Sequence, residues 1–222
     1  LARGGLLYDK FWKVSSAAEP TDAHPLWAKR PDMTTNTRTG STTWRCKECH
    51  GWDSRGVEGA YAKGSHKTGF PGVVGSSLTA EDLTESIADT HAYRAAGLSD
   101  VDIESLVLFL REGLVDTSKW IDENGAFRGD AKRGQKLYLK SFGKTKSCSE
   151  CHGPRGLKPP KGPDASYEDF VGAVATKNPW EFLHKVRFGQ PGTKMPAAVT
   201  EGVPMQDIVD LSAYAQTLPK NK

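Results

Sequence analysis

The 222-residue chain contains four cysteines, and all four fall in two copies of one five-residue motif. The copies read Cys46-Lys47-Glu48-Cys49-His50 and Cys148-Ser149-Glu150-Cys151-His152. This C-x-x-C-H spacing is typical of c-type haem attachment, in which two thiols bind the two vinyl groups of one porphyrin and the adjacent histidine binds the iron. A four-cysteine zinc site or two disulfides would not explain a histidine after each cysteine pair. We therefore expect two covalently bound haem c groups.

The segments that precede the motifs are also duplicated. Arg3-Gly-Gly-Leu-Leu-Tyr8 matches Arg133-Gly-Gln-Lys-Leu-Tyr138 at an offset of 130 residues. Internal similarity of this kind predicts two tandem units of the same architecture. We expect a first domain over residues 1–118, which contains a loop insert over residues 14–44, and a second domain over residues 119–222.

The signals for secondary structure are helical in both halves. Ser99, with Asp102 three residues later, predicts a capping box, and the helix that follows ends at Gly113. In the second half, Pro179 favours a helix start, and residues 205–218 have the spacing of a closing helix.

Ser166 and Asp169 predict the start of a further short helix. The alternation of polar and apolar residues that is typical of strands is not convincing anywhere in the chain. We therefore expect an all-α fold, in which each domain wraps around one haem.

Charge and hydropathy narrow the class of protein. The chain carries a net charge of +3, which divides into 14 basic and 16 acidic residues up to position 120 and 16 basic and 11 acidic residues after it. This basic excess is too small and too dispersed for a nucleic-acid-binding protein. The sequence has no apolar run near the roughly 18 residues that span a bilayer. Because the chain starts at Leu1 and haem is attached outside the bacterial cytoplasm, we expect a periplasmic or otherwise exported protein whose signal peptide has been removed.

Both halves resemble class I cytochrome c domains, and the whole chain resembles a diheme cytochrome c of the c4-like type. The resemblance is based on the two C-x-x-C-H motifs, the Gly-x-x-Leu-Tyr opening helices and the "KMPA" sequence before the last helix. It implies that the sixth iron ligand of each haem comes from a loop shortly before the closing helix. Met195 occupies that place in the second half and His91 in the first. We therefore expect His/Met ligation by His152 and Met195, and bis-histidine ligation by His50 and His91.

Other ligands for the first iron remain open at this point. His66 follows the first motif in a glycine-rich loop, His24 and Met33 lie in the insert, and Tyr93 follows His91. The insert makes the first half depart from the family pattern. Residues 8 and 46 are 38 positions apart, whereas residues 138 and 148 are only 10 apart, so the first half has 28 extra residues. We expect a surface loop that shields the first haem.

The second half contains further candidate functional residues. Arg187 is a candidate partner for a haem propionate, whereas His184 and Met205 are expected to be helix residues rather than ligands. Six basic residues surround the second motif: Lys140, Lys144, Lys146, Arg155, Lys158 and Lys161. They predict an acidic redox partner at the edge of the second haem.

Two six-coordinate irons leave no position for a substrate, which predicts an electron carrier that passes electrons from the first haem to the second. The alternative is an oxidoreductase in which the first haem has a labile or open sixth position. Thiosulfate dehydrogenase-like and peroxidase-like diheme proteins are the comparisons for that class.

Overall fold

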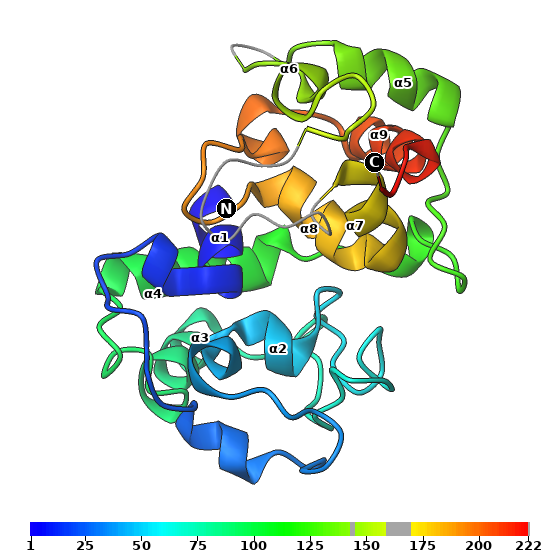
Figure 1. The fold of residues 1–222 in the computed structure, drawn as a ribbon. Coiled ribbons are helices and arrows are strands. Elements are labelled where there is room, and N and C mark those ends of the chain that lie inside the picture. Colours follow the sequence, from blue (N-terminus) through cyan, green and yellow to red (C-terminus); the bar gives the residue numbers. More distant parts are fainter. Residues whose placement is uncertain (143–144, 159–169, 222) are drawn as a thin grey trace. The chain divides into compact units, whose positions relative to one another are not determined.

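The computed structural model describes residues 1–142, 145–158 and 170–221 (Figure 1). These residues form helices and loops, and their only β-type pairings are the isolated bridges Gly56–Pro71 and Ile121–Phe127. The predicted all-α class is confirmed. The predicted helix start at Ser166 and Asp169 lies outside the described residues.

The chain divides into two compact units. The first contains Leu1–Val115 and Phe188–Met195, and the second contains Asp116–Arg187 and Pro196–Lys222. The assignment of haem-binding domains to residues 1–118 and 119–222 stays a prediction.

The first unit is built from four α-helices: α1 (Ala2–Lys10), α2 (Cys46–His50), α3 (Ala80–Glu85) and α4 (Asp100–Leu108). Two π-helical turns extend these helices, η4 (Ser86–Thr90) after α3 and η5 (Phe109–Gly113) after α4. Ser99 and Asp102 form the predicted capping box at the start of α4. The insert contains two 3-10 turns, η2 (Pro25–Lys29) and η3 (Gly40–Trp44), and a shorter one, η1 (Phe11–Lys13), follows α1.

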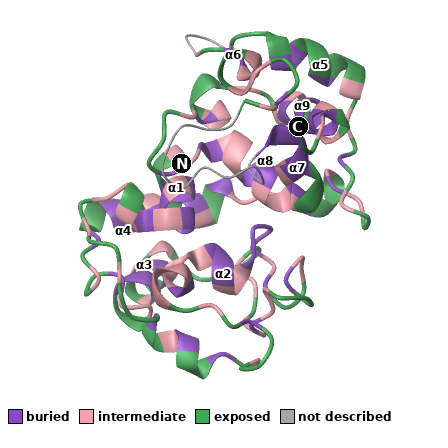
Figure 2. Cartoon of the chain, viewed as in Figure 1, coloured by how far each residue is buried: buried purple, intermediate pink, exposed green. Residues whose placement is uncertain are grey.

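The second unit contains α5 (Ala131–Leu139), α6 (Cys148–His152), α7 (Val171–Lys177), α8 (Pro179–Phe188, of which the last residue belongs to the first unit) and α9 (Met205–Thr217). Two short 3-10 turns, η6 (Thr117–Lys119) and η8 (Ala198–Glu201), lie in its connections. The predicted starts at Pro179 and Met205 are confirmed. The helices α5, α7 and α9 pack together around a core that includes Leu183, Ile208 and Leu211, and buried residues line α7 and α9 in Figure 2.

The duplication seen in the sequence is repeated in the helix packing. A Cβ atom on Gly4 of α1 would lie 2.0 Å from the carbonyl oxygen of Ser105, and one on Gly134 of α5 would lie 1.9 Å from that of Asp210. Each opening helix therefore crosses its closing helix at a glycine, because any side chain there would collide with backbone.

Two further contacts occur in both units. Arg3 pairs with Asp102 near the start of α4, and Arg133 pairs with Asp207 near the start of α9. The Tyr8 hydroxyl donates to the carbonyl of Gly51 at 2.8 Å, and the Tyr138 hydroxyl donates to that of Gly153, also at 2.8 Å. The two glycines directly follow the C-x-x-C-H motifs, so each opening helix holds the end of its own motif.

Candidate haem-binding sites

The first C-x-x-C-H motif forms the single helical turn α2. Gly51 ends this turn at φ +81°, and its backbone N–H donates to the Lys47 carbonyl at 3.0 Å. The thiols of Cys46 and Cys49 are free, and burial raises the pKa of Cys46 to about 11 and that of Cys49 to about 12. Both sulfur atoms lie on one helical turn beside the histidine.

A backbone carbonyl orients the imidazole of His50. Its Nδ1 lies 2.8 Å from the carbonyl oxygen of Pro71, a residue held in place by the bridge to Gly56. Burial lowers the pKa of His50 to about 4, so the ring is neutral and Nδ1–H is the donor. The lone pair of Nε2 is then available for a metal, because the hydrogen bond of one ring nitrogen determines the tautomer of the other.

His91 is oriented in the same way by a different element. It follows η4, and its backbone N–H donates to the Ser86 carbonyl at 2.8 Å. Its ring Nδ1 lies 2.9 Å from the same carbonyl oxygen, so it is Nδ1 and not Nε2 that this carbonyl engages. The next residue, Ala92, has φ +57°, an uncommon conformation for a residue with a side chain. Such π-turns and backbone outliers are frequent at functional sites.

The rings of His50 and His91 lie close together in the first unit. Their centroids lie 6.3 Å apart, with an interplanar angle of 49°. Two imidazoles that bind one metal ion from opposite sides, at about 2.0–2.1 Å each, have centroids about 6 Å apart. The structure thus brings together the two histidines that were predicted as ligands of one iron, at a separation that fits a shared metal.

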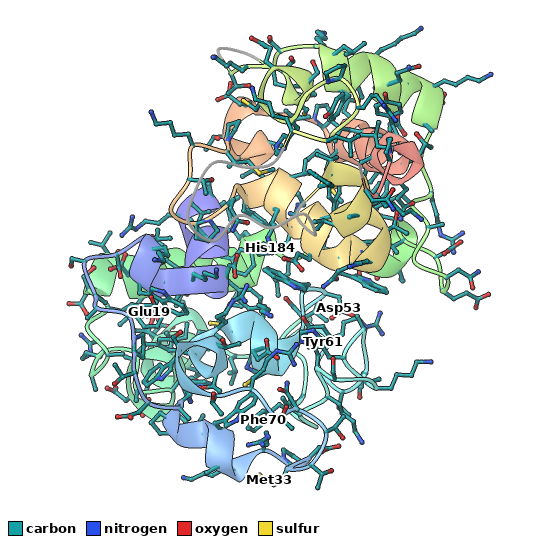
Figure 3. The ribbon with its side chains drawn as sticks, in the orientation of Figure 1. Glu19, Met33, Asp53, Tyr61, Phe70 and His184 are labelled. Carbon is teal, nitrogen blue, oxygen red and sulfur yellow. The ribbon has the colours of Figure 1, made fainter. Side chains whose placement is uncertain are left out.

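The alternative ligands for the first iron have other contacts. The Nδ1–H of His66 donates to Glu48 at 3.1 Å, and its Nε2 accepts from Arg38 at 3.0 Å, so both ring nitrogens are engaged. The Tyr93 hydroxyl donates to the Trp44 carbonyl at 2.7 Å. Met33 is 52% exposed and lies at the periphery of the first unit (Figure 3).

His24 of the insert lies close to His91 but is not oriented as a ligand. Its Nδ1 accepts from the backbone N–H of Leu26 at 3.1 Å, and its Nε2 lies 2.9 Å from the carbonyl oxygen of His91. The Nε2 atom must therefore carry the proton and donate it. Burial, followed by the nearby His91, lowers the pKa of His24 to about 4, which keeps the ring neutral.

A second group of insert residues meets the motif at Glu48, whose side chain is fully buried. Asn36 donates to it at 2.9 Å and Lys47 at 2.6 Å, and Arg38 lies 3.3 Å away. Burial alone would raise the pKa of Glu48, but the His66 hydrogen bond and the Lys47 charge outweigh it and hold that pKa well below its usual range. The insert is therefore joined to the α2 turn through the buried carboxylate of Glu48.

Arg30 of the insert is a residue that sequence analysis missed. Its side chain is buried and donates to the carbonyls of Trp27, Met33 and Asn36, while its Nε has no partner in the described residues. No described carboxylate pairs with Arg30, and its charge lowers the pKa of the Cys49 thiol against the larger effect of burial. A buried cation close to the attachment thiol, with a donor unused, fits a propionate-bearing group.

The second motif forms α6, which ends at Gly153 with φ +77°. Ser147 and Glu150 form a capping box at its start. Burial raises the pKa of the Cys148 thiol to about 11 and lowers that of His152, so the ring is neutral, as a metal ligand must be. The thiol of Cys151 is free and exposed.

The other predicted residues of the second half lie in two units. Met195 is partly buried at the end of the Phe188–Met195 segment, which belongs to the first unit, whereas His152 belongs to the second. Its role as a ligand stays a prediction. Arg187 is partly buried in α8, and burial lowers its pKa to about 10.

Four of the six basic residues around the second motif are described and exposed, namely Lys140, Lys146, Arg155 and Lys158. Lys144 and Lys161 lie outside the described residues. Within the described part of the chain, no helix is both long and apolar enough to cross a membrane.

Comparison with known proteins identifies a c-type cytochrome domain in the second half. Residues 129–214 match the family described as "Cytochrome C oxidase, cbb3-type, subunit III". Such a domain carries covalent haem c and transfers electrons to and from redox partner proteins. No curated protein matches the chain.

One similar solved structure is thiosulfate dehydrogenase (TsdBA) from Marichromatium purpuratum in its "as isolated" form, at 19% identity and a TM-score of 0.27. The match covers 87% of this chain and 39% of that chain.

Proposed function

We propose that this chain is a diheme electron-transfer cytochrome. In this proposal, His50 and His91 ligate the first haem, and His152 and Met195 ligate the second. The observation that carries it is the pair of neighbouring imidazoles, whose centroids lie 6.3 Å apart and whose Nδ1 atoms each lie within hydrogen-bond distance of a backbone carbonyl. Haem, when bound, supplies one-electron chemistry, and the protein supplies ligands, burial and a docking surface.

The residues of the first unit divide this task. Cys46 and Cys49 would anchor the haem, and His50 and His91 would ligate its iron. A site closed in this way binds no substrate at the metal, so electron exchange is the chemistry that remains. In this scheme Arg30 neutralises a propionate of the first haem, and Arg187 does so for the second.

The proposed ligand sets determine the direction of electron flow. A methionine thioether raises the potential of haem iron above that of a comparable bis-histidine haem. Electrons would then enter at the first haem and leave from the second. The charges favour the same direction, because residues 1–120 carry 14 − 16 = −2 and residues 121–222 carry 16 − 11 = +5.

The exposed basic residues around the second motif favour an acidic partner at the outgoing haem. Lys140, Lys146, Arg155 and Lys158 would raise the association rate with such a partner through long-range attraction. Because salt screens exposed charges, that rate should fall between about 10 and 200 mM ionic strength. A rate that does not depend on salt would refute this docking surface. The proposal includes a periplasmic or equivalent exported location, because haem of this type is attached outside the bacterial cytoplasm.

Ligand binding to the holoprotein tests the central claim. Cyanide added to the ferric protein and carbon monoxide added to the ferrous protein should bind the first haem slowly or not at all. His91→Ala should open that haem to both ligands, while the second haem keeps its methionine absorption band. Rapid binding to the wild-type first haem would instead favour the oxidoreductase alternative.

A potentiometric titration tests the direction of flow. The haem that shows the methionine band should be reduced first as the potential is lowered. If that haem were reduced last, the proposed direction and the ligand assignment would both be wrong.

A further inference from the structure

The insert contacts the element that carries His91 through His24. The Nε2–H of His24 donates to the carbonyl oxygen of His91 at 2.9 Å, across 67 positions of the sequence. The ring itself is held on two sides. Its Nδ1 accepts from the Leu26 N–H at 3.1 Å, and it packs edge-on against Trp44 with centroids 4.5 Å apart.

The backbone of His24 is anchored as well. Its N–H donates to the Thr43 hydroxyl at 2.8 Å, and that hydroxyl donates to the Gly40 carbonyl at 2.7 Å. His24 is only 5% exposed. Its donor therefore points at the His91 carbonyl from a ring that its contacts with Leu26 and Trp44 of the insert hold in place.

We propose that His24 is a positioning residue that holds His91 over the first iron, so that the insert keeps this haem six-coordinate. This inference rests on the proposed function, because it requires His91 to be the sixth ligand. It assigns a role to the insert beyond shielding the haem.

The backbone around His91 explains why such a contact is needed. The chain leaves α3 through a π-turn and enters the left-handed region at Ala92, which costs of order 1 kcal/mol or more for a residue with a side chain. A hydrogen bond to the carbonyl that joins His91 to Ala92 opposes relaxation of this segment.

The insert also binds the other side of the site. Asn36 donates to the buried Glu48 carboxylate of the α2 turn at 2.9 Å, twelve residues after His24 donates to His91. The same loop thus contacts the turn that carries His50 and the loop that carries His91. Loosening the loop at His24 should therefore release His91 and leave the α2 turn in place.

Three substitutions of His24 separate the two hydrogen bonds of its ring from each other and from its packing against Trp44. His24→Asn keeps an acceptor at the position of Nδ1 for the Leu26 N–H but is too short to reach the His91 carbonyl. His24→Gln places an amide donor at about the reach of Nε2. His24→Phe keeps an aromatic ring against Trp44 and removes both hydrogen bonds.

The readout is cyanide binding to the ferric holoprotein and carbon monoxide binding to the ferrous holoprotein, measured at each haem. His24→Asn and His24→Phe should raise the binding rate at the first haem about tenfold, the effect of losing one neutral hydrogen bond that holds the closed state. His24→Gln should remain near wild type. The second haem, which His24 does not contact in this scheme, serves as the internal control.

Thr43→Val is the matched control for general loosening of the insert, because it removes the anchor of His24 without changing the donor to His91. It should open the first haem much less than His24→Asn. Equal opening by Thr43→Val, equal opening by all three His24 variants, or no opening by any of them would overturn the inference.

His91→Ala distinguishes this failure from failure of the proposed function. If His91→Ala opens the first haem while the His24 variants do not, only the role of His24 is wrong. If His91→Ala leaves the first haem unchanged, the ligand assignment itself is wrong.

Discussion

The two C-x-x-C-H turns carry a glutamate at the same position and use it differently. Glu150 is exposed and accepts the N–H of Ser147 at 2.7 Å, so it caps its own helix. Glu48 is fully buried and is surrounded by Asn36, Lys47 and His66. The α2 turn has no side-chain cap. The same residue of the motif therefore caps its own helix in the second unit and binds the insert in the first.

Three contacts outside the insert are the same in both units. Both units keep the glycine at the helix crossing, the arginine pair at the start of the closing helix and the tyrosine on the glycine that follows the motif. The common frame positions each motif. The insert adds contacts around the first motif that have no counterpart in the sequence of the second half.

Exchanging the predicted distal ligands should have the largest effect. His91→Met should give the first haem a methionine band and raise its potential on the order of 0.1 to 0.3 V, a fraction of the range that axial ligands span. Met195→His should lower the potential of the second haem by a similar amount. Spectroelectrochemistry measures both, and unchanged potentials in both variants would contradict the assigned ligand sets.

Removing the charge of the buried glutamate should have the next largest effect. Glu48→Gln leaves the ammonium group of Lys47 buried without its carboxylate, which costs about 3 kcal/mol or more. Hydrogen exchange of peptides from residues 14–44 should rise sharply, because Asn36 and His66 lose their charged acceptor.

Glu150→Gln is the matched control, because glutamine also serves at this position of a capping box. It should leave exchange in the second unit almost unchanged. Equal effects of the two substitutions would show that the two glutamates do not differ in role.

The glycines at the two helix crossings should respond alike. Gly4→Ala and Gly134→Ala each place a methyl group against a backbone carbonyl and should cost about 1–3 kcal/mol of unfolding free energy in their own unit. Gln135→Ala, at the exposed neighbouring position of α5, should change that free energy by less than about 0.5 kcal/mol. Chemical denaturation, followed separately in each unit by hydrogen exchange, measures the costs. If alanine were tolerated at one of these two positions and not at the other, the two helix crossings would not be equivalent.

The loss of unfolding free energy at low pH should show the smallest effect. Burial alone would raise the pKa values of Asp102 and Asp210. Hydrogen bonds from Ser99 and Arg3 bring the pKa of Asp102 below its usual range. Hydrogen bonds from the backbone N–H of Asp130 and from the Arg133 side chain do the same for Asp210. Because these groups bind fewer protons folded than unfolded, their contribution is complete above the ordinary aspartate pKa of about 3.9 and is lost as the pH falls through the folded value.

Asp102→Asn should therefore reduce stability near neutral pH and flatten its decline in acid, as measured by denaturation at several pH values. Asp100→Asn, at an exposed position of the same helix, should leave the shape of that decline unchanged. A decline in acid that is the same in wild type and Asp102→Asn would rule out this contribution.

Sequence alone determined the features that depend on short spacings. The two C-x-x-C-H turns, the duplicated opening helices, the Ser99–Asp102 cap and the closing helix from Met205 each follow from residues within one or two helical turns. Local hydrogen bonds and helical periodicity act over that range. The position of His91 relative to the closing helix was visible for the same reason.

Only the tertiary structure decided which long-range contacts each side chain makes. It brought His91 close to His50, engaged both nitrogens of His66 with Arg38 and Glu48, and brought His24 to the His91 carbonyl. It also buried Arg30 without a carboxylate partner in the described residues. No local pattern encodes these contacts, because they join residues tens of positions apart through the folding of an irregular loop. The identical glutamates show this most directly, since the same residue in the same motif is a cap in one unit and a buried anchor in the other.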